Sequence, residues 1–468
     1  MKLYNTASRK IEEFIPIHGK KVTLYTCGPT VYDETHIGHM RKYTMDDILK
    51  RTLKYLEYDV NHVMNITDVG HLSGNDDTGE DKLEKGAKKS GKTVWDVAKY
   101  YTDKFFETMD ALNIIRPDKV VKATEHIKQM VDLVKRLEEK GFTYQTSEAV
   151  YFDVTKFRAY GRLSGQRLEE KKQAARGDVY VDPGKKHPAD FALWFKRVGR
   201  FKDHTMHWES PWGDGFPGWH IECSAMSMAY LGETIDIHTG GIDHIPVHHE
   251  NEIAQSEAAT GKKFVNFWVH HAFLQVENEK MSKSKGNYFT KQDVLNHEIN
   301  PLALRYLFLQ THYRQEMNFT WEAAEAAQET FEKIKDIVVD LRLSIQTSSK
   351  QQESNRDLFN SFKLIFSQSL SSDINTSEAV ANMWNMLKSE LLPSEKLDLL
   401  FSFDEIFGLG LKTTKEDKIP QELIEIADQR VKARKENDFK KSDELRKQIE
   451  DQGYIIEDND EGYRIKKK

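Results

Sequence analysis

The stretch KVTLYTCGPTVYDETHIGHMR, residues 21–41, decides the fold of this chain. Its first six residues alternate between apolar and polar side chains, which is typical of a short strand. Cys27 lies where that strand is expected to end, and Gly28-Pro29 predict a turn directly after it. The apolar-periodic run Met40–Leu56 then predicts a helix. The stretch therefore predicts a strand that delivers a thiol to a turn and a helix.

Two histidines stand at the expected start of that helix. His36 and His39 are three residues apart, so their side chains are expected on neighbouring positions of one surface. Backbone N–H groups and the helix dipole favour an anion at such a start. Gly38 has no side chain to keep a nucleotide away. The segment predicts a phosphate-binding turn beside a thiol, and a surface loop with two histidines is the alternative.

The composition limits the class of protein. A chain of 468 residues is long enough for two or three domains, and 38% hydrophobic residues are typical of a globular protein. The net charge is 68 − 75 = −7, which neither indicates nor excludes a polyanionic partner. No apolar run has membrane-spanning length, and the first residues lack the apolar core of a signal peptide. Cys27 and Cys223 are the only cysteines, which favours free or metal-bound thiols in a reducing cytoplasm.

Hydrophobic periodicity predicts a mixed order of strands and helices. In the first part of the chain we expect a strand at Tyr58–Ile66, an exposed turn at His71–Lys92, helices at Val94–Leu112 and Thr124–Lys140, a hairpin at Phe142–Asp153, and an insertion at Lys156–Val198. Next come helices at Gly218–Leu231 and Val247–Thr260, with a strand at Thr234–His238 between them. Beyond Pro301 helices follow one another, at Leu302–Gln310, Trp321–Leu343, Asp357–Ser369 and Glu378–Ser389. The last segment, 421–468, contains a charged helix pair and two short strands.

Residues 86–93, GAKKSGKT, match the phosphate-loop pattern G-x-x-x-x-G-K-T. The mechanism of that loop needs a buried strand that delivers it. The preceding segment, Glu80–Lys85, is a charged and solvated run instead. We therefore expect that this match is not a phosphate site.

The strongest chemical signal is a possible metal site. His248 and Glu252 are four residues apart on one expected helix and so point the same way. Cys223 lies on the preceding helix, and Cys27 ends the first strand. Two thiolates, an imidazole and a carboxylate are a plausible zinc set, whereas His249 and Glu250 are expected off that face. Taken singly, a buried core cysteine and a surface histidine are the alternatives.

A second signal is the loop KMSKSKG, residues 280–286. It follows an apolar run and ends in a flexible glycine. Ammonium groups on a mobile loop neutralise a pyrophosphate as it leaves. An ordinary basic loop is the alternative.

These motifs resemble a known family. The HIGH sequence at 36–39 together with KMSKS at 280–284 resembles the paired signatures of class I aminoacyl-tRNA synthetases. Over nearly its whole length the chain is similar to cysteinyl-tRNA synthetases, in pieces that include TCGPTVYD, NITD, PGWHIECSAM, HHENEIAQSEA and LRYLFL. The resemblance implies an α/β fold: a Rossmann-like parallel sheet split by an insertion, then an α-helical bundle and a small α+β C-terminal domain. The implied division is 1–120 and 216–300 for the catalytic halves, 121–215 for the insertion, 301–412 for the stem-contact and bundle region, and 413–468 for the anticodon module.

The resemblance also implies roles for residues. His36, Gly38, His39 and Lys283 match the ATP site, and Lys280 matches the second loop lysine. Trp219, His238 and Asp243 match residues near the amino-acid pocket. The family zinc ligands fall on Cys27, Cys223, His248 and Glu252, the four that residue type and helix geometry favour.

The implied reaction joins L-cysteine to tRNA(Cys). The cysteine carboxylate attacks the α-phosphate of ATP, with Mg²⁺ accompanying the nucleotide, and the aminoacyl group passes to the terminal ribose. Serine differs from cysteine by one atom, which an apolar pocket discriminates poorly, whereas one zinc ion per chain prefers sulfur. We hypothesise that Glu252 loosens to admit the substrate thiolate. A cytoplasmic monomer without an editing domain is expected.

Two alternatives remain, and several segments depart from the family. A related ligase that joins cysteine to an amino-sugar shares both motifs and the zinc set, and a non-catalytic tRNA-binding relative would keep the fold. Residues 69–80 and the region 204–209, with His204 and His207, look like insertions. Thr239 replaces a glycine of the family and is expected to alter the approach to the adenosine. Ile465 stands at a family tryptophan position, where it can only pack and cannot stack on an anticodon base.

Overall fold

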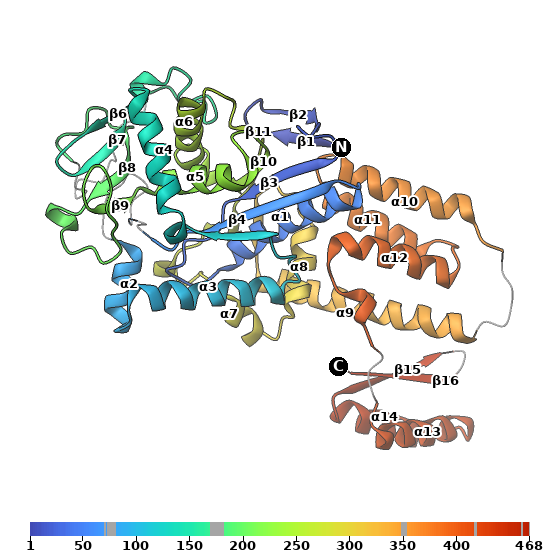
Figure 1. The fold of residues 1–468 in the computed structure, drawn as a ribbon. Helices are drawn as coiled ribbons and strands as arrows, with labels where there is room; N and C mark the ends of the chain where they lie inside the picture. The colour runs from blue at the N-terminus through green and yellow to red at the C-terminus, as the bar shows by residue number, and fades with distance from the viewer. Residues whose placement is uncertain are drawn as a thin grey trace.

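The computed structural model describes residues 1–69, 72, 81–168, 182–347, 353–415, 419–459 and 462–467. A five-stranded parallel sheet lies at its centre, in the order β11–β10–β3–β4–β5 (Figure 1). The strands span Lys21–Thr26 (β3), Asp59–Ile66 (β4), Lys119–Lys122 (β5), Ile235–Gly241 (β10) and Val265–His271 (β11). The predicted Rossmann-like sheet is confirmed.

The strand order reverses between β3 and β10. From β3 the chain runs through α1 (Ile37–Tyr55) to β4 on one side, while β10 lies on the other side of β3. Figure 1 shows α1 and α3 (Val94–Ala111) on one face, and α4 (Ile127–Glu139), α5 (Trp219–Leu231) and α6 (His248–Thr260) on the other. Ligands of such sheets bind outside the carboxyl ends of the strands at this reversal. The ends of β3 and β10 meet there, since the N–H of Cys27 donates to the carbonyl of Thr239 at 3.2 Å.

The predicted insertion and the residues just after it form a separate small sheet. The antiparallel order β6–β7–β8–β9 joins Thr143–Gln145, Ala149–Phe152, Phe191–Lys196 and Gly215–Pro217. The hairpin expected within Phe142–Asp153 is confirmed. Residues 191–196 belong to this sheet because their side chains are buried, although we expected a non-periodic segment there. Residues 169–181 of the predicted insertion lie outside the described part.

Several local predictions were wrong. Residues 82–90, within the expected exposed turn, form helix α2, because Asp81 caps it and Leu83 and Ala87 are buried. The turn's residues 71 and 73–80, and most of the segment 69–80, lie outside the described residues. Helix α4 begins at Ile127 and not at Thr124, whose hydroxyl donates to Asp68 instead of capping a helix.

The C-terminal half is helical, as predicted. It comprises α7 (Lys291–Asn296), α8 (Pro301–Leu309), α9 (Trp321–Thr347), α10 (Arg356–Ser371), α11 (Thr376–Lys388) and α12 (Pro393–Phe407). Helices α7 and α12 were not predicted. A three-stranded sheet, β13–β12–β14, joins Glu279–Lys280, Leu274–Val276 and Met317–Phe319 beside the start of this half. A two-stranded hairpin, β1 (Lys2–Asn5) and β2 (Lys10–Glu13), precedes the central sheet.

The last segment forms a small module with its own core. It contains α13 (Gln421–Lys435), α14 (Phe439–Asp451), β15 (Tyr454–Asn459) and β16 (Gly462–Lys467). Ile465 is 8% exposed and packs in a cluster with Leu423, Ile449 and Ile456. Its side chain thus belongs to the core of the module, as the sequence predicted. Among the described residues, no helix is long and apolar enough to cross a membrane.

A buried ionic cluster joins α1 to the bundle. Arg305 on α8 is fully buried and donates to Asp47 of α1 and to the carbonyls of Leu112 and Phe407. Arg51 donates to the same Asp47 carboxylate at 2.7 Å. Breaking a buried pair leaves a charge without compensation, so this cluster fixes α1 against the bundle.

Candidate metal centre and nucleotide site

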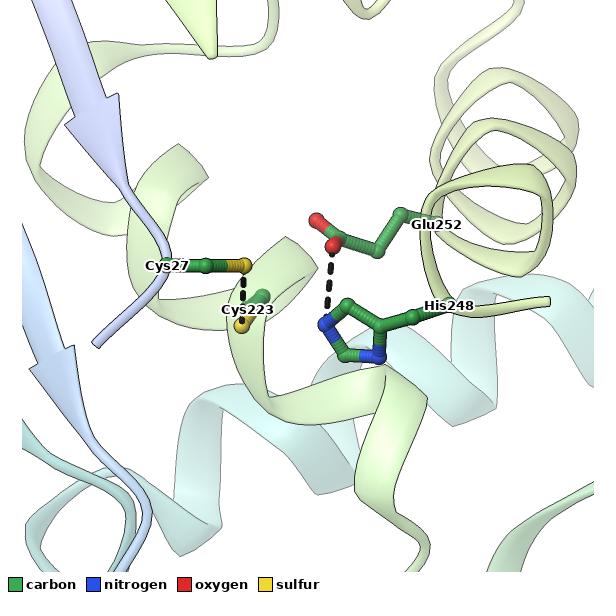
Figure 2. A group of neighbouring side chains, drawn as sticks. All are labelled: Cys27, Cys223, His248 and Glu252. Atoms are coloured by element: carbon green, nitrogen blue, oxygen red, sulfur yellow. Dashed lines mark hydrogen bonds and ion pairs between the residues drawn. The ribbon is translucent and has the colours of Figure 1, made fainter. Parts of the chain in front are cut away.

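Four potential ligands converge at the reversal of strand order. Cys27 follows β3, Cys223 lies on α5, and His248 and Glu252 lie one turn apart on α6 (Figure 2). Their ligand atoms all lie within 4.8 Å of one another. The two Sγ atoms are 3.9 Å apart, and His248 Nε2 lies 3.0 Å from Glu252 Oε1. The chain thus brings together the four residues selected from the sequence.

The donor set fits a zinc ion. Both cysteines are free and almost fully buried, at 3% and 2% exposed. Burial raises the pKa of the Cys27 thiol, and the adjacent Cys27 sulfur together with burial raises the pKa of Cys223 further. Two neighbouring thiols in a buried site are costly to ionise without a cation. Two sulfurs, one imidazole nitrogen and one carboxylate oxygen are ligands that zinc accepts in tetrahedral sites.

His249 also faces this cluster, so the expectation that it lies off the ligand face was wrong. Its Nε2 lies 3.5 Å from Cys27 Sγ and 3.9 Å from Glu252 Oε1. Cys27, His238, His249 and Glu252 therefore form a second set of donor atoms within 4.8 Å. The sequence offered a signal, because position 249 precedes 252 by three residues and i, i+3 side chains are neighbours on a helix.

A glycine makes room for that imidazole. A Cβ atom on Gly240, at the end of β10, would lie 2.4 Å from Cε1 of His249 and 2.9 Å from Nδ1 of His244. No larger residue fits there without moving the rings. Gly240 therefore lets two histidines approach the end of the strand.

Glu252 is held between two imidazoles. His238 Nε2 lies 3.1 Å from Glu252 Oε2, and His248 approaches the other oxygen. Although burial disfavours its charged form, His238 and His248 lower the pKa of Glu252 to about 2. The carboxylate is therefore ionised at neutral pH, as a metal ligand must be. His238 itself is completely buried and stacks on Trp268.

The other two residues matched to the amino-acid pocket lie beside the cluster. Trp219 begins α5 and stacks on the ring of His248, with centroids 4.3 Å apart. Asp243 follows β10 and is exposed at the surface. The three residues thus lie at different depths: His238 inside, Trp219 half-buried and Asp243 outside.

His36 caps the helix that it precedes. Its Nδ1 accepts the N–H groups of Gly38 at 3.1 Å and His39 at 3.3 Å, so these two donors are not free for an anion as we expected. The rings of His36 and His39 stack at 3.7 Å, which confirms that they share one surface. Burial, with the charges of His39 and Lys283, lowers the pKa of His36 to about 2. With Nδ1 accepting, the neutral ring carries its proton on Nε2 and presents a donor.

The lysine loop lies against the histidine segment. Lys283 forms an ion pair with Asp33, and its Nζ lies 4.9 Å from the centre of the Tyr288 ring. Farther along, the N–H of Ile37 donates to the carbonyl of Phe289 at 2.9 Å. Lys280, at the end of β13, is exposed. The structure thus brings Lys283 to the helix start and leaves Lys280 at the surface.

The phosphate-loop match is not such a loop. Residues 86–90 are helical within α2, Gly91 ends that helix in a left-handed conformation, and Thr93 caps α3. The strand that the mechanism requires is replaced by helix α2. Lys92 lies over the ring of Tyr100, with Nζ 5.0 Å from its centre.

The remaining departures have structural roles. Thr239 is buried, and its hydroxyl donates to Thr26 on the neighbouring strand. Its expected effect on the approach of a nucleotide stays a prediction. His204 is buried against Asp81, the cap of α2, with Nε2 3.0 Å from the carboxylate. His207 contacts Asp214 at 2.7 Å.

Sequence reasoning missed two residues that hold Cys27. Lys42 Nζ donates to the Cys27 carbonyl at 2.6 Å, and the Tyr43 hydroxyl donates to it at 3.3 Å. Lys42 also pairs with Asp46, one turn later on α1. The signal was an i, i+4 ion pair directly after the HIGH motif. These contacts orient the peptide of Cys27 from the helix that His36 begins.

Comparisons with a family model and with curated proteins point to the same group of enzymes. The family model of the class I (C) tRNA synthetase catalytic domain matches residues 13–329. The cysteine–tRNA ligase of Treponema denticola is 43% identical, over 98% of each chain. The cysteine–tRNA ligase of Borrelia turicatae is 39% identical over 100% of this chain and 99% of its own. Cysteine–tRNA ligase 1 of Burkholderia lata is 39% identical over 99% of this chain and 96% of its own.

Solved structures share the fold at low sequence identity. Methionyl-tRNA synthetase of Mycobacterium tuberculosis, in complex with methionyl-adenylate, has a TM-score of 0.56 at 16% identity, covering 83% of this chain and 90% of its own. The LeuRS ternary complex of Agrobacterium radiobacter K84 has a TM-score of 0.60 at 13% identity, covering 85% and 84%. These likenesses establish the architecture of the chain.

Proposed function

This chain belongs to the class I tRNA synthetases, among the cysteine–tRNA ligases, and on that basis we propose that it charges tRNA(Cys) with L-cysteine at the expense of ATP. The reaction has two steps. The cysteine carboxylate first attacks the α-phosphate of ATP, which forms cysteinyl-adenylate and releases pyrophosphate. The aminoacyl group then passes to the terminal ribose of the tRNA, and AMP leaves.

One observation carries the choice of amino acid. The side chains of Cys27, Cys223, His248 and Glu252 converge within 4.8 Å at the carboxyl ends of β3 and β10. In our proposal these four residues hold one zinc ion per chain, and Trp219, His238 and Asp243 surround the amino acid. When bound, zinc supplies a sulfur-preferring Lewis acid that separates the thiol of cysteine from the hydroxyl of serine.

The nucleotide occupies the helix start in this proposal. His36 and His39 donate to the phosphates, since Nε2 of His36 carries its proton, and Gly38 leaves space for the nucleotide. Lys283 and Lys280 neutralise the charge that develops on the leaving pyrophosphate. Mg²⁺ accompanies ATP, because the phosphates need a hard cation. These groups act by position and charge.

The same proposal assigns the remaining regions. Residues 1–120 and 216–300 form the two halves of the catalytic domain, 121–215 the insertion, 301–412 the stem-contact region and bundle, and 413–468 the anticodon module. Full-length similarity to cysteine–tRNA ligases favours a tRNA acceptor over an amino-sugar, because it includes the C-terminal module. The intact histidine and lysine motifs argue against a non-catalytic relative. A monomer in the cytoplasm is proposed, and two free thiols agree with a reducing compartment.

Two assays test the proposal. Cysteine-dependent exchange of pyrophosphate into ATP is expected, with serine giving almost none, and its absence would contradict an active ligase. Charging of tRNA(Cys) is then compared with acylation of a small amino-sugar. Product on the sugar alone would favour the related ligase.

A further inference from the structure

We propose that Asp33 is a positioning residue. In the absence of ATP its carboxylate binds the ammonium group of Lys283, and it releases that group when the triphosphate binds. The inference rests on the proposed role of Lys283 in ATP binding. It assigns a function to a carboxylate three residues before His36.

The first observation is the ion pair itself. Lys283 pairs with Asp33, whose other oxygen accepts the N–H of Glu34 at 2.9 Å. That second bond fixes the orientation of the carboxylate. The side chain of Asp33 is 26% exposed, and that of Lys283 is 59% exposed. The pair is therefore open to solvent and to an incoming anion.

The second observation concerns the space above the helix start. A Cβ atom on Gly38 would lie 2.6 Å from Cε of Met281. The loop therefore covers the glycine at which a nucleotide is proposed to approach. ATP has to displace Met281 before it can bind there.

The third observation is a tyrosine that ties the two segments together. The hydroxyl of Tyr288 donates to the carbonyl of Glu34 at 2.6 Å, and the ring of His36 meets Tyr288 edge-on at 4.8 Å. Lys283 lies over the same ring. Asp33, Tyr288 and His36 thus form one surface that receives the lysine.

We infer from these contacts that two anions exchange on the ammonium group of Lys283. The carboxylate of Asp33 and the phosphates of ATP compete for one ammonium group. ATP carries more charge, so it takes the lysine from Asp33 and the loop moves off Gly38. The ion pair holds the loop near the site between turnovers, and the cost of breaking it raises the KM for ATP.

The main variant is Asp33→Asn, compared with wild type and with Asp33→Glu, which keeps a carboxylate. Glu279→Gln is the matched control, because it removes the partner of Lys285, at 2.9 Å in the same loop, and leaves Lys283 paired. Unchanged circular dichroism and thermal unfolding establish that each variant is folded.

The first measurement is trypsin cleavage after Lys280, Lys283 and Lys285 without ATP or cysteine. Asp33→Asn is expected to be cut there several times faster than wild type, with Asp33→Glu and Glu279→Gln close to wild type. A non-hydrolysable ATP analogue should protect all four proteins alike. Equal cleavage rates without nucleotide would overturn the proposal, and this measurement does not depend on catalysis.

The second measurement is the KM for ATP in pyrophosphate exchange. Exposed ion pairs are weak, so Asp33→Asn should lower this KM roughly two- to fivefold with kcat unchanged. A lower kcat with constant KM would overturn the proposal and place Asp33 in the transition state. Failure of wild-type exchange would instead refute the proposed function.

A wild-type experiment keeps the test valid should the asparagine variant misfold. Salt screens exposed pairs, so rising ionic strength should speed cleavage within 280–286 relative to cleavage elsewhere in the same chain. An unchanged ratio would count against the ion pair as the element that holds the loop.

Discussion

The Sγ atoms of Cys27 and Cys223 lie 3.9 Å apart although 196 residues separate them in the sequence. One follows a strand of the first half of the sheet, and the other lies on a helix that precedes β10. The reversal of strand order between β3 and β10 produces this proximity, because it places the ends of two distant segments side by side.

Zinc content is the first prediction. The purified chain is expected to contain about one zinc ion, and Cys223→Ala should lose most of it, because removal of a ligand leaves three donors. Elemental analysis after dialysis against a chelator measures this. Cobalt substitution gives a second readout, since thiolate–cobalt absorption should appear in wild type and be absent from the variant. A metal-free wild type that activates cysteine normally would contradict the assignment.

Glu252→Gln is expected to weaken discrimination against serine. The amide is a poorer ligand than the carboxylate, so we expect weaker zinc binding and a smaller ratio of cysteine to serine activation. Pyrophosphate exchange with each amino acid measures the ratio at known zinc content. Glu250→Gln is the matched control. The Glu250 carboxylate accepts hydrogen bonds from the N–H groups of Gly161 and Ser164, and Glu250 is not one of the four proposed ligands. Unaltered discrimination would refute the idea that Glu252 yields to the substrate.

His36 is expected to stay neutral throughout the physiological pH range. Its pKa is lowered to about 2, whereas the pKa of a histidine in the unfolded chain is about 6.5. The unfolded chain therefore takes up a proton first, so this residue reduces stability as the pH falls from about 6.5 towards about 2. The NMR signal of the His36 ring carbon, assigned by comparison with His36→Gln, should keep its chemical shift between about pH 5.5 and about pH 8. This range includes the ordinary histidine pKa of about 6.5. A midpoint within that range would contradict the buried, capping arrangement.

Substitution of two lysines distinguishes the proposed ATP site from the phosphate-loop interpretation. Lys283→Ala should reduce pyrophosphate exchange about a hundredfold or more, because in the proposed function its charge neutralises the leaving pyrophosphate. Lys92→Ala should leave the rate close to wild type, since Lys92 lies between α2 and α3 and over the ring of Tyr100. Loss of ATP binding in Lys92→Ala would restore the phosphate-loop interpretation.

The buried cluster at Arg305 should dominate the stability of the bundle contact. Arg305→Met leaves Asp47 paired with Arg51 alone and removes the donor of the Leu112 and Phe407 carbonyls. We expect it to lower the free energy of unfolding by about 3 kcal/mol, the lower end of the range for a broken buried pair. Arg446→Met is the control, because the Arg446–Glu450 pair is exposed and should contribute less than about 1 kcal/mol. Urea denaturation followed by circular dichroism measures both. Equal losses would show that the cluster at Arg305 is not special.

The sequence predicted the elements that have one apolar face or a repeated signature. β3, α1 and the long helices of the C-terminal half follow from periodicity, and the four donors follow from residue type together with i, i+4 spacing. It did not predict the helices α2, α7 and α12. The first is short and mostly charged, and only its cap at Asp81 and two buried residues reveal it.

The i, i+3 spacing of His249 and Glu252 allowed both side chains to face the cluster but did not establish that they do. A helix position indicates a direction only relative to its neighbours, and the direction of the cluster is set by Gly240 and by the packing of β10 against β3. Likewise, an imidazole that caps its own helix competes with an anion, which a short motif does not reveal. The cap that His36 forms therefore became evident only in the folded structure.

The position of Cys27 also has a consequence for biosynthesis. When the ribosome has made β3 and β4, it has made just one of the four donors, Cys27. Cys223 follows with α5, and His248 and Glu252 follow with α6. A nascent chain therefore lacks the complete donor set until Glu252 has been made. Under the proposed function, metal loading would follow the return of the polypeptide to β3, and the ion would join parts of the sheet that were synthesised far apart in time.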